Sequence, residues 1–184
     1  GRPVQNVISI EPGDIIKTYV NAKSIESEEY CNSHFVLLAT RKGIVKKTAL
    51  SEYSNRRSRN KGINAITVRE GDELLDAILT TGDSQVLLAA RNGRCVRFDE
   101  EDARPLGRAA SGVRGISLDE DDEVMSVVCY TPGSGDAASQ TALVVSEHGF
   151  GKRTDFEEYR LTSRGGKGVR TLNITEKTGK VVAL

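Results

Sequence analysis

A unit of about fifty residues occurs three times in this chain of 184 residues, and such repetition restricts the possible folds more than any other feature of the sequence. Each unit contains two apolar segments joined by a short turn with glycine, at residues 36–47, 86–97 and 142–153. Glycine readily adopts the positive φ that tight hairpin turns require, so each pair predicts a β-hairpin. Small β units of this kind are expected to stack, since one unit cannot bury its apolar face alone.

The rest of each unit also predicts strands. An acidic or glycine-containing turn leads into an apolar opening strand, expected at residues 11–16, 70–75, 120–125 and 178–182. A basic loop with glycine follows the hairpin, at residues 55–62, 104–112 and 160–168. A closing strand comes last, expected at residues 63–68, 113–118 and 169–174, and residues 4–10 match the same strand of an earlier unit.

Four short strands per unit predict an all-β fold of propeller-like blades and not a sandwich with one core. Glycines interrupt nearly every window of helical length, and the apolar runs are short and rich in Val and Ile, which disfavours helices. Short helical turns remain compatible with residues 50–53 and 156–159. Residues 21–33 and 132–140 are expected to be loop insertions.

The repeat predicts a partial set of about three four-stranded blades with terminal pieces. The whole blades are expected at residues 11–68, 69–118 and 119–175. Residues 1–10 are expected to end a preceding blade, and residues 176–184 to begin a further one.

The charges balance, because 26 Lys and Arg residues stand against 26 Asp and Glu residues. A neutral total still permits a strong local field where the signs are separated. Carboxylates cluster at the turns between units and in the insertions, as in residues 26–29, 99–102 and 119–123, whereas cations recur in the hairpins and basic loops. Stacking the units side by side would place these cations along one edge, away from the carboxylates.

A cationic edge with glycines is suited to bind DNA. Glycine lets the backbone approach a polyanion and present amides to phosphate oxygens, while Lys and Arg supply long-range attraction. Such contacts position a duplex without reading bases, and a curved strip favours bent or wrapped DNA. Ordinary solvated charge is the alternative for any single loop, and recurrence in three units favours a shared binding strip.

The candidate DNA-binding residues are the cations of the hairpins, of the basic loops and of the strands that follow them. They are Arg41, Lys42, Lys46, Lys47, Arg56, Arg57, Arg59, Lys61, Arg94, Arg97, Arg104, Arg108, Arg114, Lys152, Arg153, Arg160, Arg164, Lys167 and Arg170.

An enzyme is a less favoured interpretation. His34 and His148 are the two histidines, and neither belongs to a catalytic or metal-binding motif. The three cysteines are far apart without C-x-x-C spacing, which indicates reduced thiols and no zinc site. Tyr53 and Tyr159 follow their hairpins at matching positions, as structural residues of a repeat would. We therefore expect no catalytic residue, no metal and no cofactor in this chain.

The sequence has no apolar stretch of about 18 residues, the length that a membrane span needs, and its start lacks the apolar core of a signal peptide. These features predict a soluble protein of the cytoplasm.

Several phrases of the sequence are similar to a known family. They are residues 38–48 (LATRKGIVKKT), 70–74 (EGDEL), 96–98 (VRF), 112–116 (GVRGI) and 149–154 (GFGKRT). They resemble the C-terminal domain of the bacterial DNA gyrase A protein, and the resemblance extends over essentially the whole chain. It implies a β-pinwheel, in which propeller-like blades exchange strands with their neighbours and DNA wraps around a basic rim.

The resemblance also implies partners and a place in the cell. The implied partners are double-stranded DNA, the remainder of the gyrase A protein and the gyrase B protein, in a bacterial, nucleoid-associated enzyme. The holoenzyme, a type IIA topoisomerase and thus an isomerase, introduces negative supercoils at the expense of ATP. The strand-cutting tyrosine of the family lies outside this domain, so the resemblance assigns no catalytic role to any tyrosine here.

Two departures from the family pattern leave alternatives open. The family domain has more blades, and its box of the form Q-R-R-G-G-K-G is absent. Residues 162–168 (TSRGGKG) are a close relative of that box in a later blade. The C-terminal domain of the topoisomerase IV A protein has similar blades and is the nearest alternative. A propeller that binds protein partners through its loops is the second.

Overall fold

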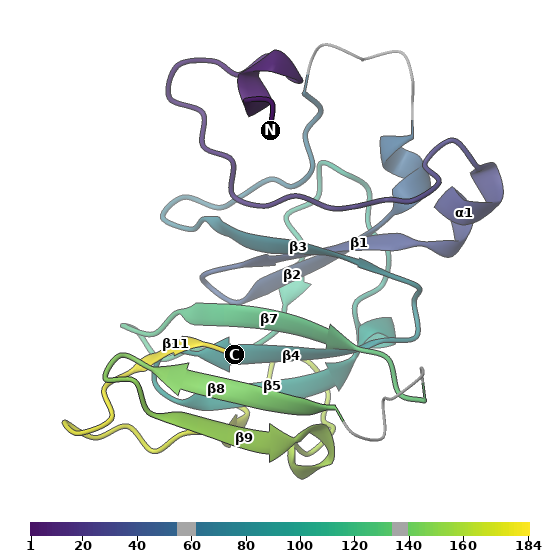
Figure 1. The fold of residues 1–184 in the computed structure, drawn as a ribbon. Coiled ribbons are helices and arrows are strands. Elements are labelled where there is room, and N and C mark those ends of the chain that lie inside the picture. Colours follow the sequence, from purple (N-terminus) through teal and green to yellow (C-terminus); the bar gives the residue numbers. More distant parts are fainter. Residues whose placement is uncertain (55–61, 134–139) are drawn as a thin grey trace.

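The computed structural model of the protein describes residues 1–54, 62–133 and 140–184. These residues form three antiparallel β-sheets that lie one above another, each around one hairpin (Figure 1). All three expected hairpins are present. They pair β1 (Phe35–Thr40) with β2 (Ile44–Ala49), β4 (Gln85–Ala90) with β5 (Arg94–Asp99), and β8 (Thr141–Ser146) with β9 (Gly151–Asp155).

Each of the first two hairpins is completed by both ends of the unit that follows it. The strand orders of these sheets are β3-β1-β2-β6 and β10-β5-β4-β7. The added strands are β3 (Leu74–Thr80), β6 (Val113–Arg114), β7 (Val124–Tyr130) and β10 (Val169–Arg170). In the described part of the third sheet, the hairpin gains only β11 (Val181–Ala183). The all-β fold with strands exchanged between neighbouring units is therefore confirmed.

The strand pairing groups the chain differently from the units expected at residues 11–68, 69–118 and 119–175. Both β3 and β6 lie in the second of these units, yet they pair with the hairpin of the first. A sequence repeat gives the spacing between similar strands. Which strands share a sheet is decided by hydrogen bonds between segments far apart in the chain.

The closing strands are shorter than expected. Only two residues pair in β6 and in β10, where six were predicted at residues 113–118 and 169–174. Residues 63–68 and 11–16 form no strand, and residues 4–10 begin with the 3-10 helix η1 (Val4–Asn6). Ala65 and Ile66 pack against the buried cluster of the first hairpin without forming a strand, and Val7 and Ile8 stay exposed.

The helical turns that the sequence allowed are present as the 3-10 helices η2 (Leu50–Tyr53) and η5 (Phe156–Glu158), and η3 (Glu100–Asp102) occupies the matching place in the second unit. The insertion at residues 21–33 is not wholly a loop, because it contains α1 (Glu28–Ser33). The Ser27 side chain caps this helix by accepting a hydrogen bond from the Tyr30 amide. In the second insertion, residues 134–139 lie outside the described residues.

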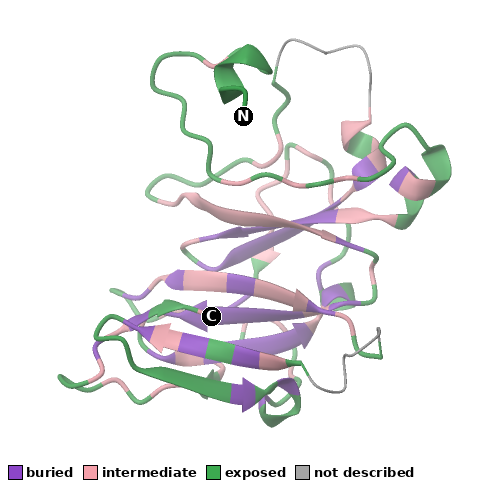
Figure 2. Cartoon of the chain, viewed as in Figure 1, coloured by how far each residue is buried: buried purple, intermediate pink, exposed green. Residues whose placement is uncertain are grey.

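The core lies between the sheets (Figure 2). Leu37 and Val45 of the first sheet pack with Leu88, Val96 and Phe98 of the second in one fully buried cluster. Strand side chains alternate between faces, so the next residues along β4 and β5 point toward the third unit. A second cluster forms there from Leu87 and Cys95 with Ala142, Phe156 and Tyr159.

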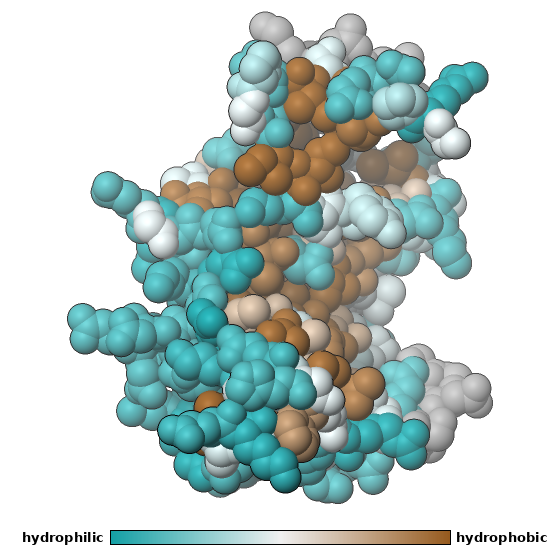
Figure 3. All heavy atoms as spheres, turned by 60° about the vertical axis from the view of Figure 1, so that its left-hand side comes forward, coloured by the Kyte–Doolittle hydropathy of each residue, from teal (hydrophilic) through white to brown (hydrophobic). Residues whose placement is uncertain are grey.

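The far face of the first sheet is covered less completely. The segment 18–25 crosses it and leaves an apolar cavity of about 310 Å³ lined by residues such as Val36, Leu38 and Tyr53. Ile15 and Tyr19 of the same N-terminal arm are largely exposed. Hydrophobic residues accordingly gather over the upper half of the face shown in Figure 3. In the described ranges, no helix combines the length and apolar character that crossing a bilayer demands.

Two glycines allow the crossing segments to lie directly on the preceding sheet. Gly112 and Gly168 precede β6 and β10, and both have positive φ values, 92° and 72°. A Cβ atom on Gly112 would lie 2.5 Å from the Val45 carbonyl oxygen, and one on Gly168 would lie 2.3 Å from the Cys95 carbonyl oxygen. Any other residue would therefore push the exchanged strand away from its partner.

We predict that Gly168→Ala lowers the free energy of unfolding by about 3 kcal/mol, because the substitution adds backbone strain and a clash with the main chain. Gly166→Ala is the matched control, since its φ is not positive and its nearest atoms are 3.9 Å away. Urea unfolding of both variants measures the difference. Equal effects of the two substitutions would contradict the close approach described here.

Candidate nucleic-acid interface

The basic loop of the third unit lies against the end of the second unit. The Gly165 amide donates a hydrogen bond to the Gly115 carbonyl oxygen at 2.6 Å, and the Ser117 amide donates to the Gly166 carbonyl oxygen at 2.9 Å. The Ser117 hydroxyl adds a bond to the Gly165 carbonyl oxygen at 2.7 Å. This loop therefore has a fixed place beside β6 and not a free position in solvent.

The basic loop of the second unit lies in the same way against residues 62–68 of the first. The Thr67 hydroxyl donates to the Ala109 carbonyl oxygen at 2.7 Å, and the Thr67 amide donates to the Ala110 carbonyl oxygen at 3.3 Å. Segments 62–68, 104–117 and 160–168 are thus neighbours in one series, which we call the basic margin. The first basic loop, with Arg56, Arg57, Arg59 and Lys61, lies outside the described residues.

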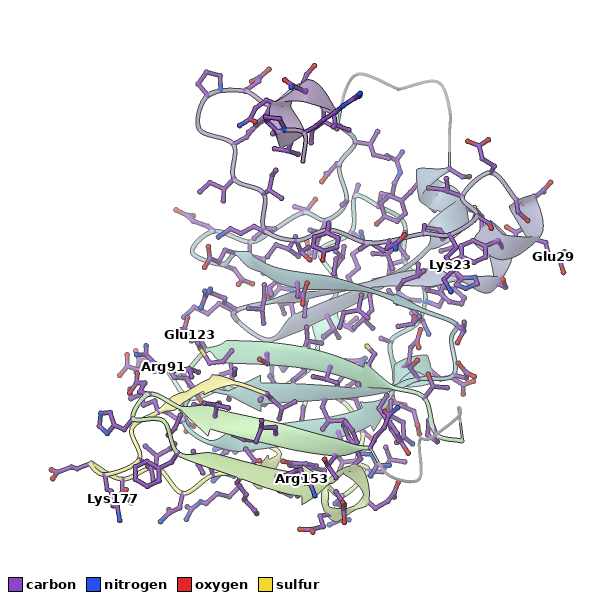
Figure 4. The ribbon with its side chains drawn as sticks, in the orientation of Figure 1. Lys23, Glu29, Arg91, Glu123, Arg153 and Lys177 are labelled. Atoms are coloured by element: carbon purple, nitrogen blue, oxygen red, sulfur yellow. The ribbon has the colours of Figure 1, made fainter. Side chains whose placement is uncertain are left out.

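Seven of the predicted cations are exposed and have no carboxylate within ion-pair distance among the described residues. They are Lys42, Arg104, Arg114, Lys152, Arg153, Arg160 and Arg170. Arg104, Arg114 and Arg160 belong to the basic margin itself. Lys152 and Arg153 lie on β9, and Arg153 points outward from the third sheet in Figure 4. The half-buried Arg94 donates to the Gly168 carbonyl oxygen at 3.3 Å.

Carboxylates are not all remote from the basic margin, which corrects the expected separation of charge. Glu52 lies 3.9 Å from the Arg108 guanidinium, and Asp119 lies 3.9 Å from the Lys167 ammonium. The Arg164 amide donates to the Asp102 carboxylate at 3.3 Å, and its guanidinium donates to the Arg114 carbonyl oxygen at 3.1 Å. These contacts hold the loops in place but lower the net positive charge beside them.

Arg41 has a different environment from the margin. Its guanidinium contacts Glu73 and also Glu123, and Glu123 contacts Arg91 in turn (Figure 4). Arg91 reaches on to Glu147 of the third unit at 3.1 Å. This row of alternating charges links all three sheets at the ends of their hairpins. Arg41 is therefore half-buried between two carboxylates and is less available to a phosphate than the exposed cations.

Lys46, Lys47 and Arg97 do not lie where the DNA-binding prediction required, because all three are buried. Lys46 is fully buried and donates to the carbonyl oxygens of Ala65 and Arg108. The Lys47 ammonium donates to the Glu100 carbonyl oxygen at 2.9 Å. The prediction is corrected for these residues, since a cation enclosed by the protein cannot reach a phosphate.

The alternation of side chains in the hairpins already carried a signal for this burial. Lys47 lies opposite Leu37 and Arg97 opposite Leu87, and both leucines are fully buried. Residues opposite each other in an antiparallel pair point to the same face of the sheet. Because lysine and arginine are usually exposed, these residues were predicted at the surface despite this pattern.

Burial also changes how several side chains ionise. It lowers the pKa of Lys46 from 10.5 to about 8, the Arg108 guanidinium lowers it further, and Glu52 opposes the shift. Burial raises the pKa of Cys95 and of Cys129 to about 12, so both thiols stay protonated at neutral pH. No group of three or more potential metal-ligating side chains occurs in the described ranges.

A small cavity of about 250 Å³ opens beside the third basic loop. Arg160, Ser163, Gly166 and Lys167 line it. Ser163 was not among the predicted residues, although its hydroxyl is a donor of the kind that contacts phosphate oxygens. A corresponding cavity of about 360 Å³ beside the second loop includes Glu52 in its lining, so its electrostatic character is more mixed.

The stacked sheets with exchanged strands and the basic margin define a propeller-like repeat protein with a cationic edge. Residues 34–81, 84–130 and 140–184 match a family model described as the DNA gyrase C-terminal domain, beta-propeller. The chain belongs to this family. Each of the first two matched segments holds one hairpin and the opening strand of the next unit, as the sheets do.

Relatives in sequence and in structure agree with this assignment. The chain is 45% identical over all 184 residues to the DNA gyrase A protein of Staphylococcus aureus (strain MRSA252), and it spans 20% of that protein. A crystal structure of the C-terminal domain of DNA topoisomerase IV superposes with a TM-score of 0.83 at 26% identity, covering 98% of this chain and 53% of the other.

The structure of a DNA gyrase A C-terminal domain superposes with a TM-score of 0.81, covering 98% of this chain and 56% of the other. Its 23% identity makes this a likeness of fold. The expected β-pinwheel architecture is confirmed by these matches and by the strand order. The sequence relative is a gyrase A protein, so the gyrase assignment fits better than topoisomerase IV.

We predict that the contribution of Lys46 to the free energy of unfolding rises as the pH increases from about 8 to about 10.5. Over this range the folded protein has released the Lys46 proton while the unfolded chain retains it, so deprotonation favours the folded state. The difference in the free energy of unfolding between the unmodified chain and Lys46→Met, measured with urea across this range, isolates this contribution from that of Cys95 and Cys129, whose raised pKa values lower the stability as the pH rises above about 9. The difference should shift in favour of the unmodified chain as the pH rises, and a constant difference would contradict the lowered pKa of Lys46.

Proposed function

We propose that this chain binds double-stranded DNA without sequence preference along the basic margin and supports DNA wrapping. The observation that carries the proposal is the contact between each basic loop and the closing segment of the preceding unit. These contacts place the loops of the second and third units in one series, with exposed cations such as Arg104, Arg114 and Arg160 along it. Family membership adds independent support.

The physical basis is neutralisation of the phosphate backbone. Lys and Arg release condensed counterions when they contact phosphates, which drives binding and makes it dependent on salt. Hydroxyls and glycine amides of the loops supply short-range donors to phosphate oxygens. Each sheet stacks on the next, so successive loops are displaced along the stack, and a duplex that follows them contacts several units in turn.

The role of the whole assembly is part of the same proposal. The gyrase A relatives are about five times longer than this chain, which spans 20% of their length. We assign the chain to the DNA-wrapping part of a gyrase A protein that acts with the gyrase B protein in ATP-dependent negative supercoiling, in the bacterial cytoplasm at the nucleoid. The chain itself then contributes DNA binding, with no catalytic residue and no cofactor.

A protein-binding propeller is the alternative that needs an experiment. Loops of propeller-like folds are general interaction sites, and the fold alone does not decide between a nucleic acid and a protein partner. The cavity beside the third loop favours DNA, because two cations, two hydroxyl side chains and glycine backbone line it without a carboxylate.

We predict that the chain binds a random duplex with an affinity that falls steeply with salt, by a log–log slope of about −0.9 for each phosphate neutralised. Replacing Arg160 and Lys167 together by Ala should weaken binding to all sequences alike and flatten the slope by about 2. Fluorescence anisotropy over a series of salt concentrations measures both quantities.

Lys177→Ala is the control for these substitutions, since Lys177 is an exposed lysine outside the basic margin (Figure 4). It should leave the slope unchanged. A loss of affinity restricted to one DNA sequence, or binding that does not respond to salt, would contradict phosphate recognition. Stability should change little in all these variants, because exposed charges contribute little individually.

A further inference from the structure

Arg97 belongs to the second sheet, but most of its side-chain hydrogen bonds go to the third unit. Only 4% of it is exposed. Its guanidinium donates to the carbonyl oxygens of Phe156 at 2.7 Å and Tyr159 at 3.0 Å, and it contacts the Glu157 carboxylate at 3.0 Å. These three acceptors belong to η5 and the residue after it. Within its own sheet the guanidinium is held by Gln85 at 2.8 Å.

The backbone of Arg97 holds the chain where the third basic loop begins. The Thr162 amide donates to the Arg97 carbonyl oxygen at 2.9 Å, and the Thr162 hydroxyl donates to the same oxygen at 3.2 Å. Leu161 forms an isolated parallel bridge with Arg97. Arg160, an exposed cation of the basic margin, therefore lies between two points that Arg97 fixes, Tyr159 by the side chain and Leu161 by the main chain.

The other end of the loop is fixed by the same strand. Val169 of β10 pairs with Cys95 of β5, and Arg94 donates to the Gly168 carbonyl oxygen. The third basic loop is thus attached at both ends to the preceding unit. Charged side chains contribute at both ends, Arg97 before the loop and Arg94 after it, and the Arg97 guanidinium makes the larger number of hydrogen bonds.

The first and second units repeat the arrangement with a lysine. Lys47 has the register position of Arg97 and donates to the Glu100 carbonyl oxygen of η3. The Leu106 amide donates to the Lys47 carbonyl oxygen at 2.8 Å, and Pro105 forms the parallel bridge. A buried cation therefore occurs at the same register position in two units, and in each case it supports the basic loop of the following unit. The recurrence indicates a property of the repeat and not an isolated contact.

We propose that Arg97 is a positioning residue for DNA binding, which sets the place of the third basic loop from within the preceding unit and does not itself touch DNA. The inference rests on the proposed function, because it assumes that the loop binds phosphate. Without the guanidinium, the Tyr159 carbonyl oxygen would lose this donor and the Phe156 carbonyl oxygen would keep only the Tyr159 amide, so the turn before Arg160 would shift to reach water.

The test is a double-mutant cycle on DNA affinity with the 184-residue chain. Arg97→Met should weaken binding of a random duplex roughly tenfold and flatten the salt slope, as removal of the loop cations does. Combined with Arg160→Ala and Lys167→Ala, it should add little further loss. Combined with Arg104→Ala in the second loop, the two losses should add, since the sites are independent.

Two further variants separate positioning from general loss of stability. Val86→Ala removes buried volume from the opposite face of the same sheet and should lower stability while leaving the salt slope unchanged. Arg97→Lys should restore part of the affinity lost in Arg97→Met, because lysine fills this role at residue 47. If Arg97→Met does not fold, Arg97→Lys replaces it in the cycle. The loss of DNA affinity should then be smaller, and it should again add little to the loss caused by the third-loop substitutions.

A salt slope in Arg97→Met equal to that of the unmodified chain would overturn the inference, and so would full additivity with the third-loop substitutions. Either result leaves DNA binding by the chain intact. Absence of salt-dependent binding in the unmodified chain would instead remove the proposed function, so the two failures are distinguishable.

Discussion

The structure depends on the completion of each hairpin by the unit that follows it. A two-stranded hairpin leaves both its edges unpaired and its faces open to water, and alone it is barely stable. Here β3 and β6 complete the first hairpin, and β7 and β10 complete the second. The same exchange carries each basic loop across to the preceding sheet. Fold stability and the alignment of the loops therefore have one cause.

This exchange explains why the cations of the sequence have two distinct uses. Where a strand is covered by the next unit, its basic residue is enclosed and bonds to carbonyl oxygens, as for Lys47 and Arg97. Where nothing covers it among the described residues, the equivalent residue stays exposed, as Arg153 does beside the half-exposed Leu143. The neutral overall charge is consistent with both uses, since carboxylates also accompany the loops.

Much of the fold could be predicted from the sequence because it depends on local patterns. Gly43 and Gly93 between apolar runs indicated hairpins, and both have the positive φ expected. The exchange of strands between units was implied only by the family resemblance, because the period of a repeat does not show which distant strands meet. The exposed Arg104 and Arg160 could be identified as candidates by composition, whereas the burial of Lys46 depends on contacts with Ala65 and Arg108, far away in the sequence.

In the function proposed above, basic loops of successive units form one DNA-binding margin. Hydrogen–deuterium exchange of the chain, with and without a random duplex, shows whether these loops are covered together. We expect protection to appear together in residues 104–117 and 160–170, while the turn at residues 175–180 and the helix α1 exchange as in the free protein. Protection confined to a single loop, or found only on α1 and the turn at 175–180, would contradict the account.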